Sequence, residues 1–386
     1  MPTQLSTGDL LERLVAFDST SRNSNTPIAE FICDYVDRPG VRIDKHDSPA
    51  GDKINLIIST GPQENLDRAG LILSGHMDAV PAEEEDWSSD PFELMSRQGS
   101  YFGRGACDMK GFLALAMNII VRSSKTRLAH PLVLVFTYDE EVGTIGAEHL
   151  VKSWPDVASL PRLAVIGEPT SLRVVRMHKG HLKLLLTFTG RAAHSGYPHL
   201  GSNAIEPAGE AIVQLKELRD ELESEHPPHS EHFGEVPHPT LNIGRVIGGS
   251  AVNIVPDRCT VEVGIRTLPE MSSGELIERV RARLSGALQE ANMTLEMTGE
   301  SPPMLLSENS ELYRSLCHEI GQSSTEAVSF ATDAGWFQVA GIESVLFGPG
   351  DMEQAHRANE SIPIDQLHRA ESILERLTQR FCSAAS

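Results

Sequence analysis

The feature that most constrains the fold of this chain is an uninterrupted apolar run at Pro131–Phe136. Successive side chains of a strand point to opposite faces, so a strand that is apolar throughout belongs in a sheet covered on both faces. Leu163–Gly167 is a second run of this kind, and Leu71–Leu73 is a shorter one. Helical patterns at Thr7–Phe17 and Phe112–Val121 alternate with these strands. We therefore expect an α/β sandwich built on a mixed sheet.

The length of 386 residues indicates two domains rather than one. After Met177 the pattern changes to strand, helix, strand, strand and helix, which is typical of a small α+β domain. The α/β character then returns, with a strand at Ser344–Phe347. We expect a discontinuous first domain at residues 1–176 and 294–386, interrupted by a smaller inserted α+β domain at residues 177–293.

The charge and the cysteines limit the partners and the compartment. Lys and Arg total 33 against 54 Asp and Glu, and the resulting net charge of −21 argues against binding to nucleic acid or to anionic membranes. The cysteines are scattered and never form a Cys-x-x-Cys pair, which is typical of free thiols in a reducing compartment. The first residues carry no basic or apolar signal region, and no apolar stretch is long enough to span a membrane. We expect a cytoplasmic protein.

A histidine and a carboxylate directly follow the Leu71–Leu73 run. Residues two apart on an extended backbone project to the same face, so His76 and Asp78 can meet. A metal-binding imidazole usually donates its second N–H to a carboxylate, which fixes its tautomer and orientation. This pairing predicts a metal ligand with an orienting carboxylate, although such a pair at the end of a strand also occurs incidentally.

Asp108 lies within the glycine-rich segment Gly103–Gly111, directly before the apolar helix. Glycines let a backbone approach other groups closely or adopt unusual dihedral angles. A carboxylate held in such a segment can offer one oxygen to each of two metal ions. The alternative is that Asp108 only caps the helix that follows.

Three adjacent acidic residues follow the Pro131–Phe136 strand. Asp139, Glu140 and Glu141 end the Pro131–Phe136 strand, where burying three acids is costly unless cations or protons offset their charge. Neighbouring residues point in different directions, so one of Glu140 and Glu141 can bind metal while the other takes a proton. A solvated acidic turn is the alternative interpretation.

Glu168 ends the Leu163–Gly167 strand, and His356 lies in a loop after the Ser344–Phe347 strand. Ligands bind at the carboxyl ends of the strands of α/β sheets. Five side chains at such positions are therefore candidate ligands, namely His76, Asp108, Glu141, Glu168 and His356. Two histidines and three carboxylates fit a pair of zinc ions when one carboxylate bridges them.

Several segments in this order resemble one family of enzymes. They are Ser74–Pro81, Trp87–Phe92, Gly103–Gly111, Asp139–Gly143, Gly167–Thr170 and Glu353–His356. The chain resembles the co-catalytic zinc hydrolase family that includes acetylornithine deacetylase, succinyl-diaminopimelate desuccinylase, aminoacylase and glutamate carboxypeptidase. The similarity spans almost the whole sequence.

The resemblance implies a role for each metal-site residue. His76 and Glu168 would bind one zinc, Glu141 and His356 the other, and Asp108 would bridge the two ions. Asp78 would orient His76. Glu140 would be the general base, which takes a proton from water and returns it to the departing amine. The family also implies a cis peptide bond between Asp108 and Met109, and it implies two divalent ions, zinc with cobalt as an alternative.

The inserted domain carries the substrate-binding residues that the resemblance implies. Gly190–Gly196 is similar to a family segment whose histidine reaches the active site of a partner subunit, so His194 is the candidate oxyanion donor. Asn253 and Arg266 match positions that hold polar groups of the substrate. The resemblance thus implies a homodimer in which the inserted domain serves for dimerisation and as a lid.

The substrate is expected to be an N-acyl amino acid, because an arginine such as Arg266 can hold a carboxylate through two hydrogen bonds. Met177–His181 and Phe330–Gly335 look most similar to the acetylornithine deacetylases. The expected reaction is hydrolysis of N2-acetyl-L-ornithine to L-ornithine and acetate, a step of arginine biosynthesis. Another acyl amino acid, such as succinyl-diaminopimelate, or a small peptide is the alternative within the family. A metal-free, non-catalytic dimeric binding protein is the alternative outside it.

Overall fold

The computed structural model describes residues 4–62, 67–83, 85–287 and 292–384. The chain forms two compact units. The first unit contains Met1–Met177, Leu306–Glu326 and Thr332–Ser386, and the second contains His178–Leu305 and Ala327–Ala331. The second unit continues past residue 293, where we expected it to end, because the strand β12 (Asn292–Ser301) pairs with β9 (Gly180–Thr189) of the same unit.

The first unit is built on a mixed sheet, as the sequence predicted. Along it lie β1 (Val41–Asp47), β2 (Ile54–Thr60), β6 (Leu132–Thr137), β3 (Leu71–His76), β7 (Leu163–Ile166), β15 (Glu343–Leu346) and β8 (Val175–His178). The central strands β6, β3, β7 and β15 run parallel, while β1, β2 and β8 pair with their neighbours in the antiparallel sense. Two short strands, β13 (Met304–Leu305) and β14 (Glu326–Val328), lie where the chain passes between the units.

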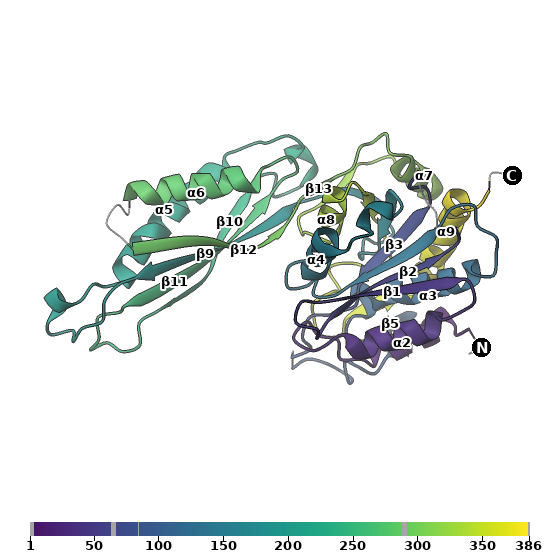
Figure 1. Cartoon of the computed structure of the whole chain (residues 1–386), viewed down its shortest axis with the longest axis horizontal. Helices are drawn as coiled ribbons and strands as arrows, with labels where there is room; N and C mark the ends of the chain where they lie inside the picture. Colours follow the sequence, from purple (N-terminus) through teal and green to yellow (C-terminus); the bar gives the residue numbers. More distant parts are fainter. Residues whose placement is uncertain (1–3, 63–66, 84, 288–291, 385–386) are drawn as a thin grey trace. The chain divides into compact units, whose positions relative to one another are not determined.

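Helices cover both faces of this sheet, since every residue of β3 and β6 is buried and their side chains alternate between the faces. Helix α3 packs on β2, β3 and β6, with α1, α2 and α9 beside it, while α4 packs on β2, and α8 packs on β15 and α4. Figure 1 shows α4 and α8 next to each other. The helices of the first unit are α1 (Thr7–Val15), α2 (Thr26–Val36), α3 (Gly111–Ser123), α4 (Ile145–Ser153), α7 (Glu311–Ile320), α8 (Ala334–Val339) and α9 (Ile364–Cys382).

The carboxyl ends of three parallel strands meet at one edge of the sheet. His76 of β3 is paired with Thr137 of β6, and Ser74 of β3 is paired with Ile166 of β7. The loops that follow these strands therefore start side by side. A small separate sheet joins β16 (Ser361–Pro363), β5 (Ser100–Phe102) and β4 (Met95–Arg97), and so brings the C-terminal segment beside the segment that precedes α3.

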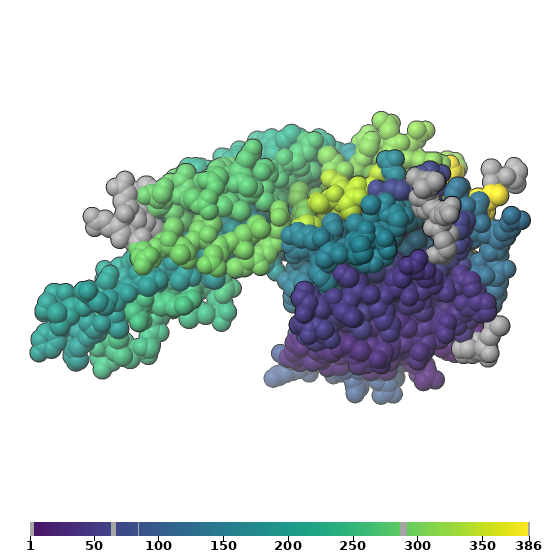
Figure 2. All heavy atoms as spheres, in the orientation of Figure 1, coloured from purple at the N-terminus to yellow at the C-terminus, as the bar shows by residue number. Residues whose placement is uncertain are grey.

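The first unit combines distant parts of the chain. Figure 2 shows yellow atoms of the C-terminal part packed against blue and purple atoms of the N-terminal half within this unit. Among the described residues, we find no helix that is long and apolar enough to cross a membrane.

The second unit is an antiparallel sheet in the order β10-β11-β9-β12, with β10 (Thr240–Gly248) and β11 (Arg258–Thr267). The side chains of β9 are alternately buried and partly exposed, because one face of the sheet packs on α5 (Ile205–Glu223) and α6 (Ser273–Ala287). Leucine and valine side chains from the strands and both helices form its core. The sequence predicted these elements except β12, although the alternation of Met293, Leu295 and Met297 with polar residues is a strand pattern that the prediction overlooked.

Candidate metal centre

Two groups of ligand-type side chains lie at the carboxyl edge of the large sheet. The first group contains His76, Asp108 and Glu168, and the second contains Asp108, Glu141 and His356. Within each group, one possible ligand atom from every side chain lies within 4.8 Å of the others. These are the five side chains that the sequence predicted as ligands, and Asp108 is the one that belongs to both groups.

The two carboxylate oxygens of Asp108 face different histidines. Oδ1 is 3.1 Å from Nε2 of His76, and Oδ2 is 3.1 Å from Nε2 of His356. The same His356 nitrogen is 2.9 Å from Oε1 of Glu141. Asp108 is thus placed to offer one oxygen to each of two cations. The peptide bond between Asp108 and Met109 is cis, as the family resemblance implied.

His76 is oriented by a neighbouring oxygen, although the oxygen differs from the one that we expected. Its Nδ1 is 2.9 Å from the backbone carbonyl of Asp78 and 3.6 Å from the Asp78 carboxylate, so the hydrogen bond is made to the carbonyl. This bond places the proton on Nδ1 and leaves Nε2 free to bind a metal on the side of Asp108.

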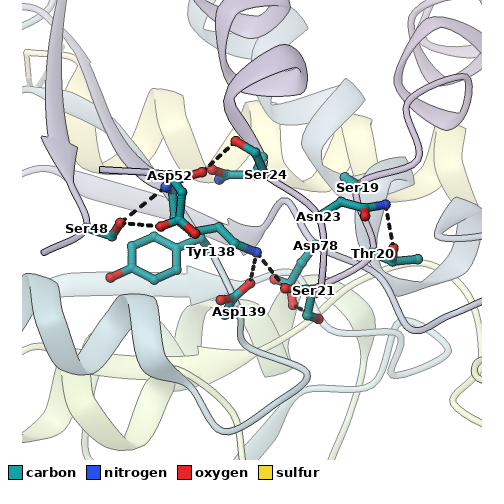
Figure 3. A network of polar contacts seen from close by, with 12 residues as sticks. Ser19, Thr20, Ser21, Asn23, Ser24, Ser48, Asp52, Asp78, Tyr138 and Asp139 are labelled. Carbon is teal, nitrogen blue, oxygen red and sulfur yellow. Dashed lines mark hydrogen bonds and ion pairs between the residues drawn. The ribbon is translucent and has the colours of Figure 1, made fainter. Parts of the chain in front are cut away.

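The Asp78 carboxylate instead holds the acidic loop after β6. It accepts hydrogen bonds from the backbone N–H groups of Glu140, at 3.1 Å, and Glu141, at 3.2 Å. It also accepts one from the hydroxyl of Ser21, at 2.7 Å (Figure 3). Asp78 is fully buried, so these donors stabilise its charge and it in turn fixes both glutamates.

Asp139, the first acid of that loop, is part of an ion pair. The ammonium group of Lys53 lies 2.6 Å from its carboxylate and donates a second hydrogen bond to the backbone carbonyl of Ser21, also at 2.6 Å. Asp139 belongs to the polar network of Figure 3. Asp139 is therefore occupied by this ion pair and lies outside both ligand groups.

Burial makes the glutamates of this centre poor anions, whereas hydrogen bonds from His356 and His76 hold the pKa of Asp108 below its usual value. It raises the pKa of Glu168 well above its usual value, and the nearby Asp108 carboxylate raises it further. Burial also raises the pKa of Glu140, and burial together with Asp108 raises the pKa of Glu141 to about 7. The hydrogen bond to Asp108 raises the pKa of His356 to about 10. Such a cluster favours cations or protons among its carboxylates.

One buried acid beside this centre was missing from the sequence prediction. Asp333 accepts a hydrogen bond from the hydroxyl of Thr137, at 2.6 Å, and burial raises its pKa to about 6. Its other oxygen, Oδ1, has no hydrogen-bond partner among the described residues. The residue lies in Phe330–Gly335, a segment that the sequence analysis used only for comparison, and nothing in its local pattern indicated a place near His76.

The predicted substrate residues lie in the second unit, at both ends of its sheet. His194 forms an isolated β-bridge with Ile254, and the backbone N–H of Ser195 donates to the carbonyl of Asn253, so His194 and Asn253 are neighbours on exposed loops. Arg266 is paired with His181 at the other end of β11. That position is eight residues beyond Arg258, or about 27 Å along an extended strand.

The ligand groups fit a pair of divalent cations. Each group offers one imidazole nitrogen and carboxylate oxygens, which are the donors that zinc and similar ions accept. The shared Asp108 is placed to bridge the two positions. His356 has a side chain that is 45% exposed, so the second group is accessible from solvent.

Comparisons with known proteins agree with this geometry. The profile of the Peptidase family M20/M25/M40 matches residues 72–380. The acetylornithine deacetylase of Pasteurella multocida is 32% identical over 363 residues, which cover 93% of this chain and 92% of that protein. The acetylornithine deacetylase of Myxococcus xanthus is 33% identical over 383 residues, with 96% of each chain covered.

A solved structure has the same fold. The M20 family metallo-carboxypeptidase Sso-CP2 of Sulfolobus solfataricus has a TM-score of 0.76 at 18% identity, with 98% of this chain and 99% of that chain covered. Together with the profile match over most of the sequence and the curated relatives above 30% identity, this shows that the chain belongs to the M20/M25/M40 peptidase family.

Proposed function

We propose that this chain is a two-zinc amidohydrolase that converts N2-acetyl-L-ornithine to L-ornithine and acetate, a step of arginine biosynthesis. The observation that carries the proposal is the pair of ligand groups that share the Asp108 carboxylate. In the proposed arrangement, His76 and Glu168 complete one site, and Glu141 and His356 complete the other. Zinc suits these nitrogen and oxygen donors, and cobalt is the alternative ion.

The reaction combines the cations with a protein base. When bound, two divalent cations polarise a carbonyl group and lower the pKa of water toward neutrality. Glu140 is the proposed general base, which accepts a proton from the attacking water and passes it to the departing amine. Burial raises the pKa of Glu140, which favours its holding a transferred proton, and the Asp78 carboxylate holds the Glu140 backbone in place.

The proposed substrate follows from the relatives and from Arg266. The two curated relatives described above carry the name acetylornithine deacetylase, and each match covers more than nine tenths of this chain. Arg266 is proposed to hold the carboxylate of the amino acid through a bidentate contact. The alternative substrate is another acyl amino acid, such as succinyl-diaminopimelate, or a dipeptide.

We further propose a homodimer in which His194 and Asn253 act on the substrate of the partner subunit, His194 as the oxyanion donor. His194 and Asn253 lie at one end of the sheet, and Arg266 lies toward the other end. This separation supports the proposal, because one chain can contribute His194 and Asn253 to one active site and Arg266 to another. The edge strand β10 exposes Val246 and Ile247. An unpaired edge with apolar side chains is a ready surface for a second copy of the chain.

The proposed compartment is the cytoplasm. All five cysteines are free, and burial raises the pKa of the Cys107 and Cys382 thiols, which makes them poor thiolates. Free, unreactive cysteines fit a reducing environment, where disulfides are rare.

Substitution of the ligands tests the two-metal site. We expect Asp108→Ala to lose both ions, because both groups share this carboxylate, and Glu168→Ala or Glu141→Ala to lose one ion each. Metal content after dialysis, measured by inductively coupled plasma mass spectrometry, gives the stoichiometry. Glu353→Gln, which changes an exposed acid outside the two groups, is the control and retains both ions. A wild-type protein with less than one zinc and no gain from added Zn²⁺ or Co²⁺ would support the metal-free alternative instead.

The general base has its own test. We expect Glu140→Gln to retain both ions but to lose about 10²- to 10⁴-fold in kcat, because an amide cannot accept the proton. Steady-state kinetics with metal analysis on the same sample separates this result from loss of metal. A kcat near that of the wild type would refute the assigned role.

A panel of substrates tests the proposed specificity. Acetylornithine, succinyl-diaminopimelate, acetylcitrulline, neutral acetylated amino acids and dipeptides are compared by kcat/KM. We expect acetylornithine to have the highest value. A higher kcat/KM for any other member would replace the proposed substrate and leave the metal chemistry unchanged.

The dimer can be tested at its proposed surface. We expect Val246→Lys combined with Val213→Glu to give a protein with the mass of one chain, because charges on an edge strand and on the adjacent helix α5 oppose association. Sedimentation equilibrium measures this mass. The variant should keep its two ions and lose turnover, whereas Val339→Lys, at an exposed position of α8, should change neither. A fully active monomer would contradict a role for His194 across subunits.

A further inference from the structure

Glu360 is a buried carboxylate close to the proposed metal centre, although it is not one of the side chains that form the two ligand groups. Glu360 is 1% exposed and lies four positions after His356 in the sequence. Its two oxygens accept four hydrogen bonds from a single stretch of chain. Oε2 accepts from Arg104 Nη1 at 2.9 Å and from the Gly105 backbone N–H at 3.0 Å, while Oε1 accepts from the backbone N–H groups of Cys107 at 2.9 Å and Asp108 at 3.0 Å.

The main chain on both sides of Glu360 reinforces this contact. The backbone N–H of Gly103 donates to the Glu360 carbonyl at 3.0 Å. The next residue, Ser361, pairs with Phe102 in the small sheet that joins β16 and β5. Gly105 has a φ of +76°, a left-handed conformation that favours glycine, and this turn directs its N–H toward the Glu360 carboxylate. The carboxylate and the glycine-rich segment are therefore fitted to each other.

The bound segment ends at the ligand that both metal sites share. The last of the four donors is the backbone N–H of Asp108, so Glu360 fixes the main chain from which the bridging carboxylate projects. The oxygens of that carboxylate each lie 3.1 Å from a histidine nitrogen, one from His76 and one from His356. A shift of the Asp108 backbone would change both distances together.

The contact also needs a full carboxylate rather than any polar group. Arg104 is completely buried, so its guanidinium requires an acceptor. The three backbone N–H groups that bind Glu360 require acceptors as well. An amide in place of the carboxylate has one oxygen and would direct its own N–H donors at two of these donors. Buried donors without an acceptor are costly, so the segment would have to rearrange.

We propose that Glu360 is a positioning residue for both metal sites, holding the Arg104–Asp108 segment so that the two oxygens of Asp108 face the two cations. This inference rests on the proposed two-metal function. Glu360 acts through Asp108 and does not itself touch the ions or the substrate. Its removal is expected to weaken both sites, whereas loss of a ligand that belongs to one site weakens that site alone.

The test is a measurement of metal affinity in the intact protein. Metal-free wild type and Glu360→Gln are titrated with Zn²⁺ in competition with a chromophoric chelator, which gives a dissociation constant for each ion without substrate. We expect the affinity for both ions to fall about 10- to 100-fold, the usual effect of removing a group that orients a ligand. Unchanged affinities for both ions in Glu360→Gln would overturn the inference.

A matched substitution separates positioning from a general loss of stability. Glu371 of α9 is a carboxylate in the same unit with an 18% exposed side chain, and it accepts hydrogen bonds from Arg122 at 2.6 Å and Thr7 at 3.0 Å. Glu371→Gln should lower the unfolding temperature but keep wild-type metal affinities. If this variant loses affinity for both ions to the same extent as Glu360→Gln, the effect is not specific to positioning and the inference fails.

Glu360→Asp covers the case in which the glutamine variant does not fold. Aspartate keeps the charge for Arg104 but is one methylene shorter, so it should support folding while reaching the backbone N–H groups less well. We expect its metal affinities to lie between those of the wild type and Glu360→Gln. A folded Glu360→Asp protein with wild-type affinity for both ions would contradict the inference. Failure of the wild type itself to bind two ions would instead overturn the proposed function.

Discussion

The rest of the first unit's site depends on the carboxylate of Asp108, which belongs to both ligand groups. Its oxygens lie 3.1 Å from nitrogens of His76 and His356, which come from a central strand and from the C-terminal part of the chain. One side chain can serve two positions only if its backbone is held in a fixed place. Segments that are distant in the sequence therefore have to converge on it, and the discontinuous first unit brings them together.

The same site is electrostatically demanding. Several carboxylates lie where burial raises the pKa, and the structure offsets this in specific ways. The Asp78 carboxylate accepts hydrogen bonds from two backbone N–H groups, and Asp139 forms an ion pair with Lys53. The ligand carboxylates have no comparable cation apart from the histidines among the contacts of the described residues. This imbalance is the physical reason why the centre suits divalent ions rather than a purely structural role.

The second unit distributes its polar residues differently. His194 and Asn253 lie together on loops at one end of its sheet, while Arg266 lies toward the other end. A single pocket within this unit therefore cannot collect all three side chains. The edge strand β10 and the exposed face of α5 leave apolar side chains open to solvent, a combination that favours association of two chains.

Much of this structure could be predicted from the sequence, and the physical reason is local. Buried parallel strands are apolar throughout, so Pro131–Phe136 and Leu163–Gly167 marked the sheet, and polar residues just after such strands marked its functional edge. What the sequence by itself indicated was the set of five candidate ligand residues and the α/β architecture. Only the tertiary structure decided that the Asp78 carboxylate accepts hydrogen bonds from two backbone N–H groups and that Asp333 lies beside the centre. It also decided that Glu360 accepts a hydrogen bond from the backbone N–H of Asp108, 252 residues away in the sequence. Hydrogen bonds across such separations leave no periodic pattern in the sequence, because they depend on how the elements pack and not on the residues adjacent in the chain.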